Sequence, residues 1–198
     1  LVDSTVASLE IINLIYLTEG RLPERIGNRY ESAYPYDSFT ATDGDLVIGA
    51  ANDKLWHLLV REMGKPELIE DERFLTNRDR VKNHAPLRII IQEWVKDQTV
   101  KGVVDRILAV GCPAAPIYNI AQVTEDPHIA GAREMFVSMP HPVAGEMRLT
   151  GSHIKLSKTK PTLRTPAPSL GQDNEAVYKE WLGLNPDDLA KLKEEGAI

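Results

Sequence analysis

A turn signal, a short apolar run and a helix cap follow one another between residues 43 and 63. Asp43-Gly44 favours a turn, and the apolar run at 46–51 has the length of a covered strand. Asn52 can then cap a helix, because apolar residues at helical spacing follow it as far as Met63. A strand that passes directly into a helix restricts the chain to the mixed α/β or α+β classes.

Two amphipathic helices are predicted between residues 86 and 111. Pro86 suits the first helical position, and an i, i+3, i+4, i+7 stripe runs from there to Val95. Thr99 can cap a second helix, which Gly111 closes. The apolar residues of the two stripes are Leu87, Ile90, Ile91, Trp94 and Val95, followed by Val100, Val103, Val104, Ile107 and Leu108.

The remaining patterns give shorter elements on both sides of these helices. We predict one buried helix over 1–19 that stops at Gly20, an extended segment over 21–42, and a charged loop over 70–83. After them come a strand at 113–118, a short helix capped by Asn119, and paired strands at 135–139 and 147–156. Two last helices are capped by Asp173 and Asn185, and the three tryptophans are expected in the core.

Composition excludes several classes of protein. The net charge of −6 over 198 residues argues against general nucleic-acid binding. Cys112 is the single cysteine, so it can form neither an intrachain disulfide nor a CxxC site, and we interpret it as a small buried apolar residue. The apolar run at 1–17 is too short and too polar to span a membrane and lacks a signal peptide's charged start. A cytoplasmic protein is the expectation.

Short motifs in a fixed order along almost the whole chain resemble the class III CoA-transferase family, the carnitine-dehydratase and bile-acid-inducible type. The motifs are Gly27-Asn28-Arg29, Tyr34-Pro35-Tyr36, Asp43-Gly44, the 46–53 run, Arg73-Phe74-Leu75-Thr76-Asn77, Gly111-Cys112-Pro113, Glu125-Asp126-Pro127-His128, Met139-Pro140-His141-Pro142 and Ser169-Leu170-Gly171-Gln172.

The resemblance implies a doubly wound large domain built from both chain ends, with a small α+β domain inserted between them. On that basis residues 1–20 form a helix of the large domain, 21–45 a linker and 46–139 the small domain. Residues 140–198 then form the returning linker and the C-terminal part of the large domain. Family members are interlocked homodimers, so a second copy of the chain is the expected partner.

The resemblance also implies the chemistry. Family members move CoA from an acyl-CoA to a small carboxylic acid through an aspartyl-CoA thioester, with acyl-CoA as substrate and no covalent cofactor. The aspartate nucleophile is expected upstream of this chain, so we expect no catalytic residue here and no activity from the chain alone. Asp3 matches a helix aspartate of the family and not the nucleophile.

Four residues are candidates for substrate binding. Asn28, Arg29, Tyr34 and Tyr36 match the segment that the family places near its interdomain cleft, where Arg29 would clamp a carboxylate. The alternative interpretation is a linker of ordinary turn and packing residues. The five histidines have no metal-ligand spacing, so no metal site is predicted.

A basic run between residues 147 and 172 has two interpretations. It could attract the phosphates of CoA, or its side chains could protect a solvated strand edge. Its members are Arg148, Lys155, Lys158, Lys160 and Arg164.

Two other functions stay open: an α-methylacyl-CoA racemase of the same superfamily, and a non-catalytic CoA-binding or dimerisation module. The sequence does not rank the acids, whether oxalate, succinate, mesaconate, carnitine-type or aromatic.

Overall fold

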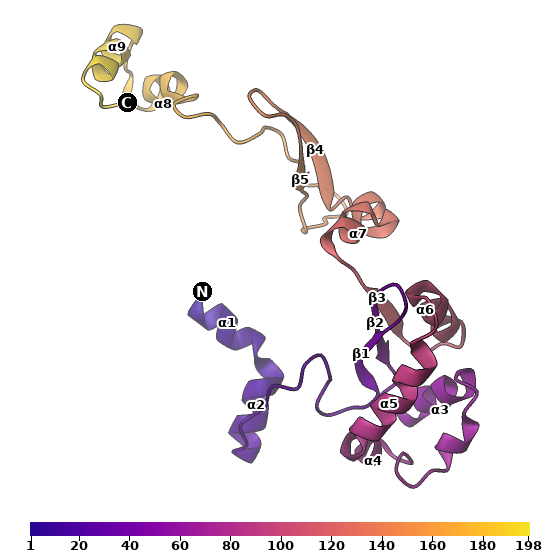
Figure 1. Ribbon diagram of the computed structural model, residues 1–198. Helices are drawn as coiled ribbons and strands as arrows, with labels where there is room; N and C mark the ends of the chain where they lie inside the picture. The colour runs from indigo at the N-terminus through magenta and orange to yellow at the C-terminus, as the bar shows by residue number, and fades with distance from the viewer. The chain divides into compact units, whose positions relative to one another are not determined.

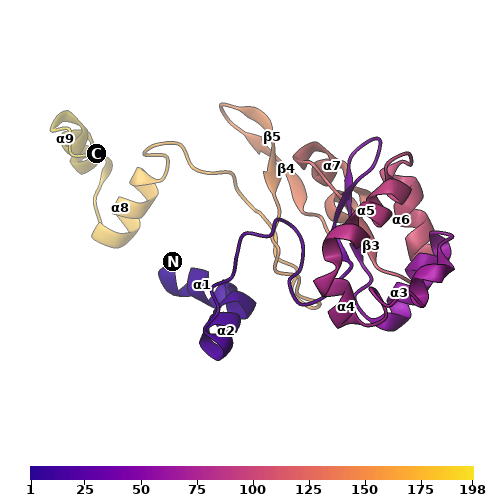
Figure 2. The same cartoon turned by 60° about the horizontal axis from the view of Figure 1, so that its bottom comes forward.

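The computed structural model describes residues 1–198, which form two compact units, Leu1–Tyr118 and Asn119–Ile198 (Figures 1 and 2). Helices and small antiparallel sheets alternate along the chain, which confirms the predicted mixed α/β class. None of the helices combines the length and apolar character needed to cross a bilayer.

The first unit contains a three-stranded antiparallel sheet in the order β1-β2-β3. Strand β2 (Asp45–Gly49) confirms the predicted strand, and β3 (Ala114–Ile117) confirms the one expected at 113–118. The prediction of an extended segment over 21–42 is wrong for Tyr36–Thr40, which form β1 and pair with β2. Its inward-facing positions are Asp37 and Phe39, and the charged residue hides the alternation that would identify a strand.

Helices cover one face of this sheet (Figure 1). Helix α3 (Asp53–Glu62) starts as predicted, with the Leu55 N–H donating to Asn52 Oδ1 at 2.9 Å. After the 3₁₀ turn η1 (Pro66–Ile69) come α4 (Asn77–Lys82), α5 (His84–Val95) and α6 (Val100–Ala109). The predicted stripes face the core, except that Leu108 is 51% exposed. The largest fully buried apolar side chains are those of Trp56, Tyr34, Phe39, Phe74, Leu46 and Ile48.

Two boundaries differ from the prediction. Residues 70–83 are not one loop, because they contain α4. Its cap is a reciprocal capping box: the Asp79 N–H donates to Thr76 Oγ1 at 3.3 Å, and the Thr76 N–H donates to Asp79 Oδ2 at 3.2 Å. The Thr76 hydroxyl also donates to that carboxylate and lowers the pKa of Asp79. Helix α5 begins at His84, so Pro86 is its third residue, where a helix N–H has no partner in any case.

The N-terminal segment forms two helices, α1 (Val2–Ser8) and α2 (Glu10–Glu19), instead of the single one predicted, and the break lies at Leu9. Helix α2 ends at Gly20, as predicted, in the left-handed conformation that glycine adopts readily. The burial expected for this segment is absent within this unit, because neither helix has a buried residue.

The second unit starts with α7 (Ile120–Glu125), capped by Asn119 as predicted, and a π-helical turn η2 (Pro127–Ala132). The predicted strand pair is confirmed as the hairpin β4 (Phe136–His141) and β5 (Gly145–Thr150), but the second strand ends at Thr150, so the prediction is wrong for 151–156. Helices α8 (Asn174–Leu182) and α9 (Pro186–Glu194) follow, the second capped by Asn185 as predicted. Asp173 stands at the N-cap position of α8, but its side chain makes no capping hydrogen bond, contrary to the prediction.

The tryptophan prediction is confirmed for Trp56, which is fully buried, and Trp94 packs against the same core partly buried. It is wrong for Trp181, which is 76% exposed because no element of the second unit covers its face of α8.

Candidate functional site

A polar pocket of about 380 Å³ lies at the edge of the sheet, beside the outer strand β1. Three segments line it: the loop at 26–29, residues Asp37 and Ser38 of β1, and residues His84 and Arg88 of α5. His84 and Arg88 are one helical turn apart, which places them on the same face of α5. Segments separated by more than 40 positions in sequence therefore meet at this edge.

Local geometry explains how the loop reaches the strand. Gly27 has φ +69°, a conformation that glycine adopts at little cost, and the chain turns there. The Asn28 amide then donates to the Ser38 hydroxyl oxygen at 3.1 Å, which joins the loop to β1. The next residue, Arg29, lines the pocket and forms no hydrogen bond or ion pair within the chain.

The charges of the pocket do not cancel. Asp37 is only 5% exposed, and its carboxylate is paired with the Arg88 guanidinium, which also lies 5.3 Å above the Phe39 ring. The Ser38 N–H donates to the same carboxylate at 2.8 Å. Within the lining of this pocket Asp37 is paired with Arg88 and Arg29 forms no ion pair, so the lining carries a net positive charge.

Tyr34 lies in the core next to the pocket. It is fully buried, and its ring meets that of His84 edge-on with centroids 6.0 Å apart. Its hydroxyl has no hydrogen-bond partner, and burial, with the nearby charge of Asp37, raises its pKa above the ordinary tyrosine value.

The segment at 32–34 is fastened to α4 through main-chain atoms. The Tyr34 N–H donates to Asn77 Oδ1 at 3.0 Å, and the Asn77 amide donates to the Ser32 carbonyl at 3.0 Å. Arg80 Nε donates to the Tyr34 carbonyl at 2.9 Å. Helix α4 thus fixes where the loop leaves the core.

Tyr36 lies on the other side of β1. It is 52% exposed, its ring is tilted against that of Tyr30 with centroids 5.5 Å apart, and it borders a mainly apolar hollow of about 290 Å³ with Val47 and Gly49. A Cβ atom at Gly49 would lie 3.4 Å from the Tyr36 ring, so the glycine leaves room for it. Of the four predicted residues, Asn28 and Arg29 share one cavity, whereas Tyr34 and Tyr36 lie outside it.

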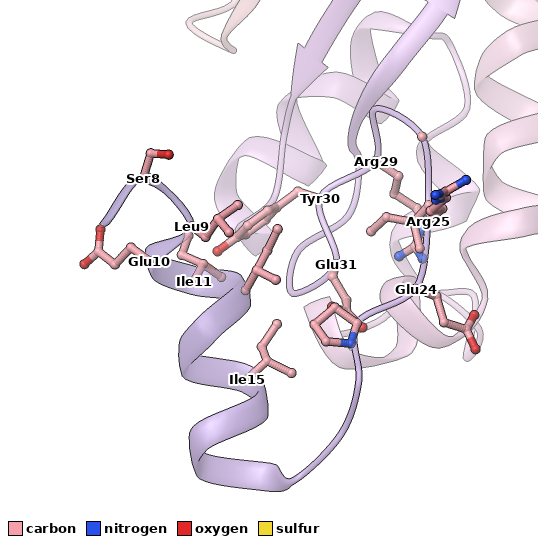
Figure 3. Close-up of a pocket in the computed structure, with 14 residues that line it drawn as sticks. Ser8, Leu9, Glu10, Ile11, Ile15, Glu24, Arg25, Arg29, Tyr30 and Glu31 are labelled. Atoms are coloured by element: carbon pink, nitrogen blue, oxygen red, sulfur yellow. The ribbon is translucent and has the colours of Figure 1, made fainter. Parts of the chain in front are cut away.

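A larger hollow of about 590 Å³ separates α2 from the following loop. Figure 3 shows Ile15 on the helix side and Arg25 and Arg29 on the loop side. Within the loop that follows α2, Arg21 Nη1 contacts Glu31 Oε1 at 2.5 Å. The helix contributes an apolar wall here, and the loop contributes charged side chains, so Arg29 borders this hollow together with Glu24 and Glu31 as well as the pocket at β1.

The comparison with known proteins decides the family. The model of CoA-transferase family III matches residues 1–174. The chain belongs to CoA-transferase family III.

Curated relatives of this family III chain are named as CoA-transferases. Succinyl-CoA–D-citramalate CoA-transferase of Chloroflexus aurantiacus is 32% identical over 99% of this chain and 49% of its own length. Succinyl-CoA:mesaconate CoA-transferase of Haloarcula marismortui is 35% identical over 90% of this chain and 44% of its own length. The chain therefore spans about half the length of the curated relatives it matches.

A solved structure has the same fold. A CAIB/BAIF family protein from Brucella suis is 30% identical, with a TM-score of 0.73 over 87% of this chain and 44% of that one. The resemblance inferred from the motifs is confirmed by these findings.

Two members of the basic run in the family III chain have partners in the second unit. Lys160 pairs with Glu134 at 2.7 Å, and Arg148 donates to the Thr124 carbonyl at 2.5 Å. Lys155 and Lys160 border a hollow of about 400 Å³. Pairing with Glu134 reduces the positive charge that this hollow offers to an anion.

Other candidate groups of the chain are structural. Cys112 is buried, and burial raises the pKa of its thiol to about 11. No group of three or more His, Cys, Asp or Glu side chains is arranged to hold a metal ion.

Sequence reasoning missed Asp37, Ser38, His84 and Arg88. The four-residue spacing of His84 and Arg88 was the one local signal available for them.

Proposed function

We propose that the protein to which this chain belongs is an acyl-CoA:carboxylate CoA-transferase. The single observation that carries the proposal is membership of CoA-transferase family III across residues 1–174. Relatives such as the citramalate and mesaconate enzymes are named for transfer of CoA between an acyl-CoA and a free acid. The positively charged pocket at β1 supports this function, because one of the two substrates is a carboxylate.

The proposed mechanism divides the exchange into acyl-transfer steps. A carboxylate nucleophile attacks the thioester carbonyl, and CoA thiolate leaves as a mixed anhydride forms. The thiolate then attacks the enzyme's acyl carbon, which releases the donor acid and leaves an aspartyl-CoA thioester. The acceptor carboxylate attacks that thioester, and the CoA that leaves attacks the acceptor's acyl carbon and restores the aspartate. No water or electrons are exchanged.

We assign the nucleophile to an aspartate outside these 198 residues, in a longer polypeptide of which the chain is about half, as its share of the relatives suggests. Asn28, Arg29 and Tyr36 are the proposed binding residues, and Tyr34 supports the loop from the core. The isolated chain is then inactive.

Further assignments follow the family. We place residues 1–20 and 140–198 in a large domain, 21–45 in a linker and 46–139 in a small domain. The protein is an interlocked homodimer of the cytoplasm that uses CoA thioesters as substrates and holds no covalent cofactor.

Incubation of the full-length protein in D₂O with a panel of acyl-CoAs and free acids tests the function. We expect new acyl-CoA species by mass spectrometry, which also identify the acid pair. Unchanged esters that gain one α-deuterium would instead establish a racemase. Esters that neither change nor gain deuterium would favour the non-catalytic CoA-binding module.

A further inference from the structure

We propose that the turn of the β4–β5 hairpin is a pH-sensitive switch, in which protonation of His141 releases residues 142–145. Two hydrogen bonds to one imidazole nitrogen at the end of β4 carry the proposal. It goes beyond the proposed transferase function, because it concerns a device within the second unit that works whatever the reaction is.

The side chain of His141 closes this turn. The Val143 N–H donates to His141 Nδ1 at 3.2 Å, and the Ala144 N–H donates to the same nitrogen at 3.1 Å. No backbone carbonyl accepts a hydrogen bond from either group. The imidazole ring is therefore the group that holds these two N–H donors in the turn.

Two other segments of the second unit have the same arrangement with an oxygen as the acceptor. In each, the accepting side chain is followed by proline and receives the N–H groups two and three positions later. Asp126 Oδ1 accepts them at 2.9 and 2.8 Å, and Asn185 Oδ1 accepts them at 2.9 and 3.1 Å. Such oxygens remain acceptors between pH 5 and 8. Among the three, only the turn at His141-Pro142 depends on an acceptor of a type that takes up a proton in that range.

Protonation removes the acceptor. Because two N–H groups donate to Nδ1, the proton of the neutral His141 ring lies on Nε2. The imidazolium ion carries an N–H at Nδ1 as well, which points at the two backbone donors and breaks both hydrogen bonds. The closed turn therefore prefers the neutral ring. Its stability falls as the pH falls through the range in which histidine becomes protonated.

The charged groups around the hairpin do not replace these hydrogen bonds. They come from β5 and from the hollow beside β4: Glu146, Arg148, Glu134, Lys155 and Lys160. The two on β5 alternate to the face of the hairpin opposite His141, and Lys160 is paired with Glu134. The polar contacts of the His141 ring are those with the two backbone N–H groups. Protonation thus costs the turn its acceptor without completing an ion pair.

Hydrogen exchange of the full-length protein tests the switch. It is read by mass spectrometry on peptides that span 141–145, at pH 7.5 and pH 5.0, and corrected for the intrinsic effect of pH on exchange. The variants are His141→Asn, which keeps an acceptor that does not titrate, and His141→Ala, which removes the acceptor. His153→Asn is the matched control, because His153 is an exposed histidine of the same unit.

We expect the wild-type amide hydrogens at 143 and 144 to lose protection roughly 3- to 10-fold between pH 7.5 and pH 5.0, the effect of losing a side-chain cap. His141→Asn should remain protected at both pH values, and His141→Ala should lack the protection at both. His153→Asn should follow the wild type. Peptides that contain the segments capped by Asp126 and Asn185 should keep their protection.

Four results would overturn the proposal: equal wild-type protection at the two pH values, pH dependence that persists in His141→Asn, pH dependence that disappears in His153→Asn, or a loss at pH 5.0 that extends to the segments capped by Asp126 and Asn185. The last would mean that acid opens the whole unit. The comparison of wild type with His141→Asn decides the question even if His141→Ala does not fold, and it requires no transfer of CoA.

Discussion

Arg80 is a buried cation satisfied mostly by carbonyl groups from separate segments. It donates to the carbonyls of Tyr34 at 2.9 Å, Phe74 at 3.1 Å and Ala51 at 3.0 Å, and to Asp53 Oδ1 at 2.8 Å. Arg80→Met would leave these acceptors without a donor inside the core. Each unsatisfied buried acceptor destabilises the fold by about 1–3 kcal/mol, and relaxation of the surrounding chain offsets part of that cost. We expect the opening free energy of β1 and β2 to fall by roughly 3–5 kcal/mol.

Hydrogen exchange of peptides from the full-length protein measures that opening free energy. Arg78→Met is the matched control, because Arg78 is an exposed residue of the same helix and should change the value by less than about 0.5 kcal/mol. Equal protection in the two variants would contradict the role given to Arg80.

Cys112 is predicted to be chemically inert in the folded protein. Burial raises the pKa of its thiol to about 11, so very little reactive thiolate exists at neutral pH. We expect no iodoacetamide adduct at Cys112 near pH 8 in native protein and full labelling in urea, read by peptide mass spectrometry. Labelling at equal rates in both states would disprove its burial.

The same shift has a consequence for stability. The unfolded thiol ionises near its ordinary pKa of about 8.5, whereas the native thiol keeps its proton until about pH 11. The unfolded state therefore binds fewer protons between these values, so the contribution of Cys112 lowers stability as the pH rises through that window.

At the scale of elements, the hairpin β4–β5 depends on a close backbone approach at its end. The Gly151 N–H donates to the Met135 carbonyl at 2.8 Å, and a Cβ atom at Gly151 would lie 2.3 Å from the Glu134 carbonyl oxygen. Gly151→Ala must push the strands apart, so we expect a loss of about 1–3 kcal/mol in protection of 136–150 against hydrogen exchange. Gly131→Ala, which has no atom within 4 Å of the new Cβ, should leave that protection unchanged. Similar losses in both variants would refute the steric explanation.

The elements that sequence reasoning found are those with local signals. The caps at Asn52, Thr99 and Asn119 and the stripe of α5 all lie within a few positions of the helix they define, and all are confirmed. The signal of β1 is interrupted by buried Asp37, which is stable there because Arg88 reaches it from 51 positions away. No local pattern contains that information.

The residues of the pocket at β1 also divide into those with a sequence signal and those without one. Asn28 and Arg29 were found through motif resemblance, whereas the side chains facing them lie on other elements. Their convergence depends on how α5 packs against the edge of the sheet, which is a tertiary property.

At the scale of the whole molecule, helices α1 and α2 expose many large apolar side chains. Leu14 is 57% and Leu17 78% exposed, and no residue of either helix is buried. We expect the 198-residue chain to self-associate, because exposed apolar patches of this kind are contact surfaces.

Sedimentation velocity tests that expectation. The double change Leu14→Glu and Leu17→Glu should shift the chain toward monomer, whereas Val143→Glu, at an isolated residue that is 83% exposed, should not. A wild-type chain that stays monomeric at high concentration would disprove it.

The way in which α4 holds the segment at 32–34 affects how this family can diverge. Asn77 and Arg80 form hydrogen bonds to the main chain of Ser32 and Tyr34, and Arg29 takes no part in this attachment. Position 29 can therefore mutate without loosening the loop. Substitutions at this position keep the same anchor, so sequence variation in this part of the loop need not come at the expense of folding.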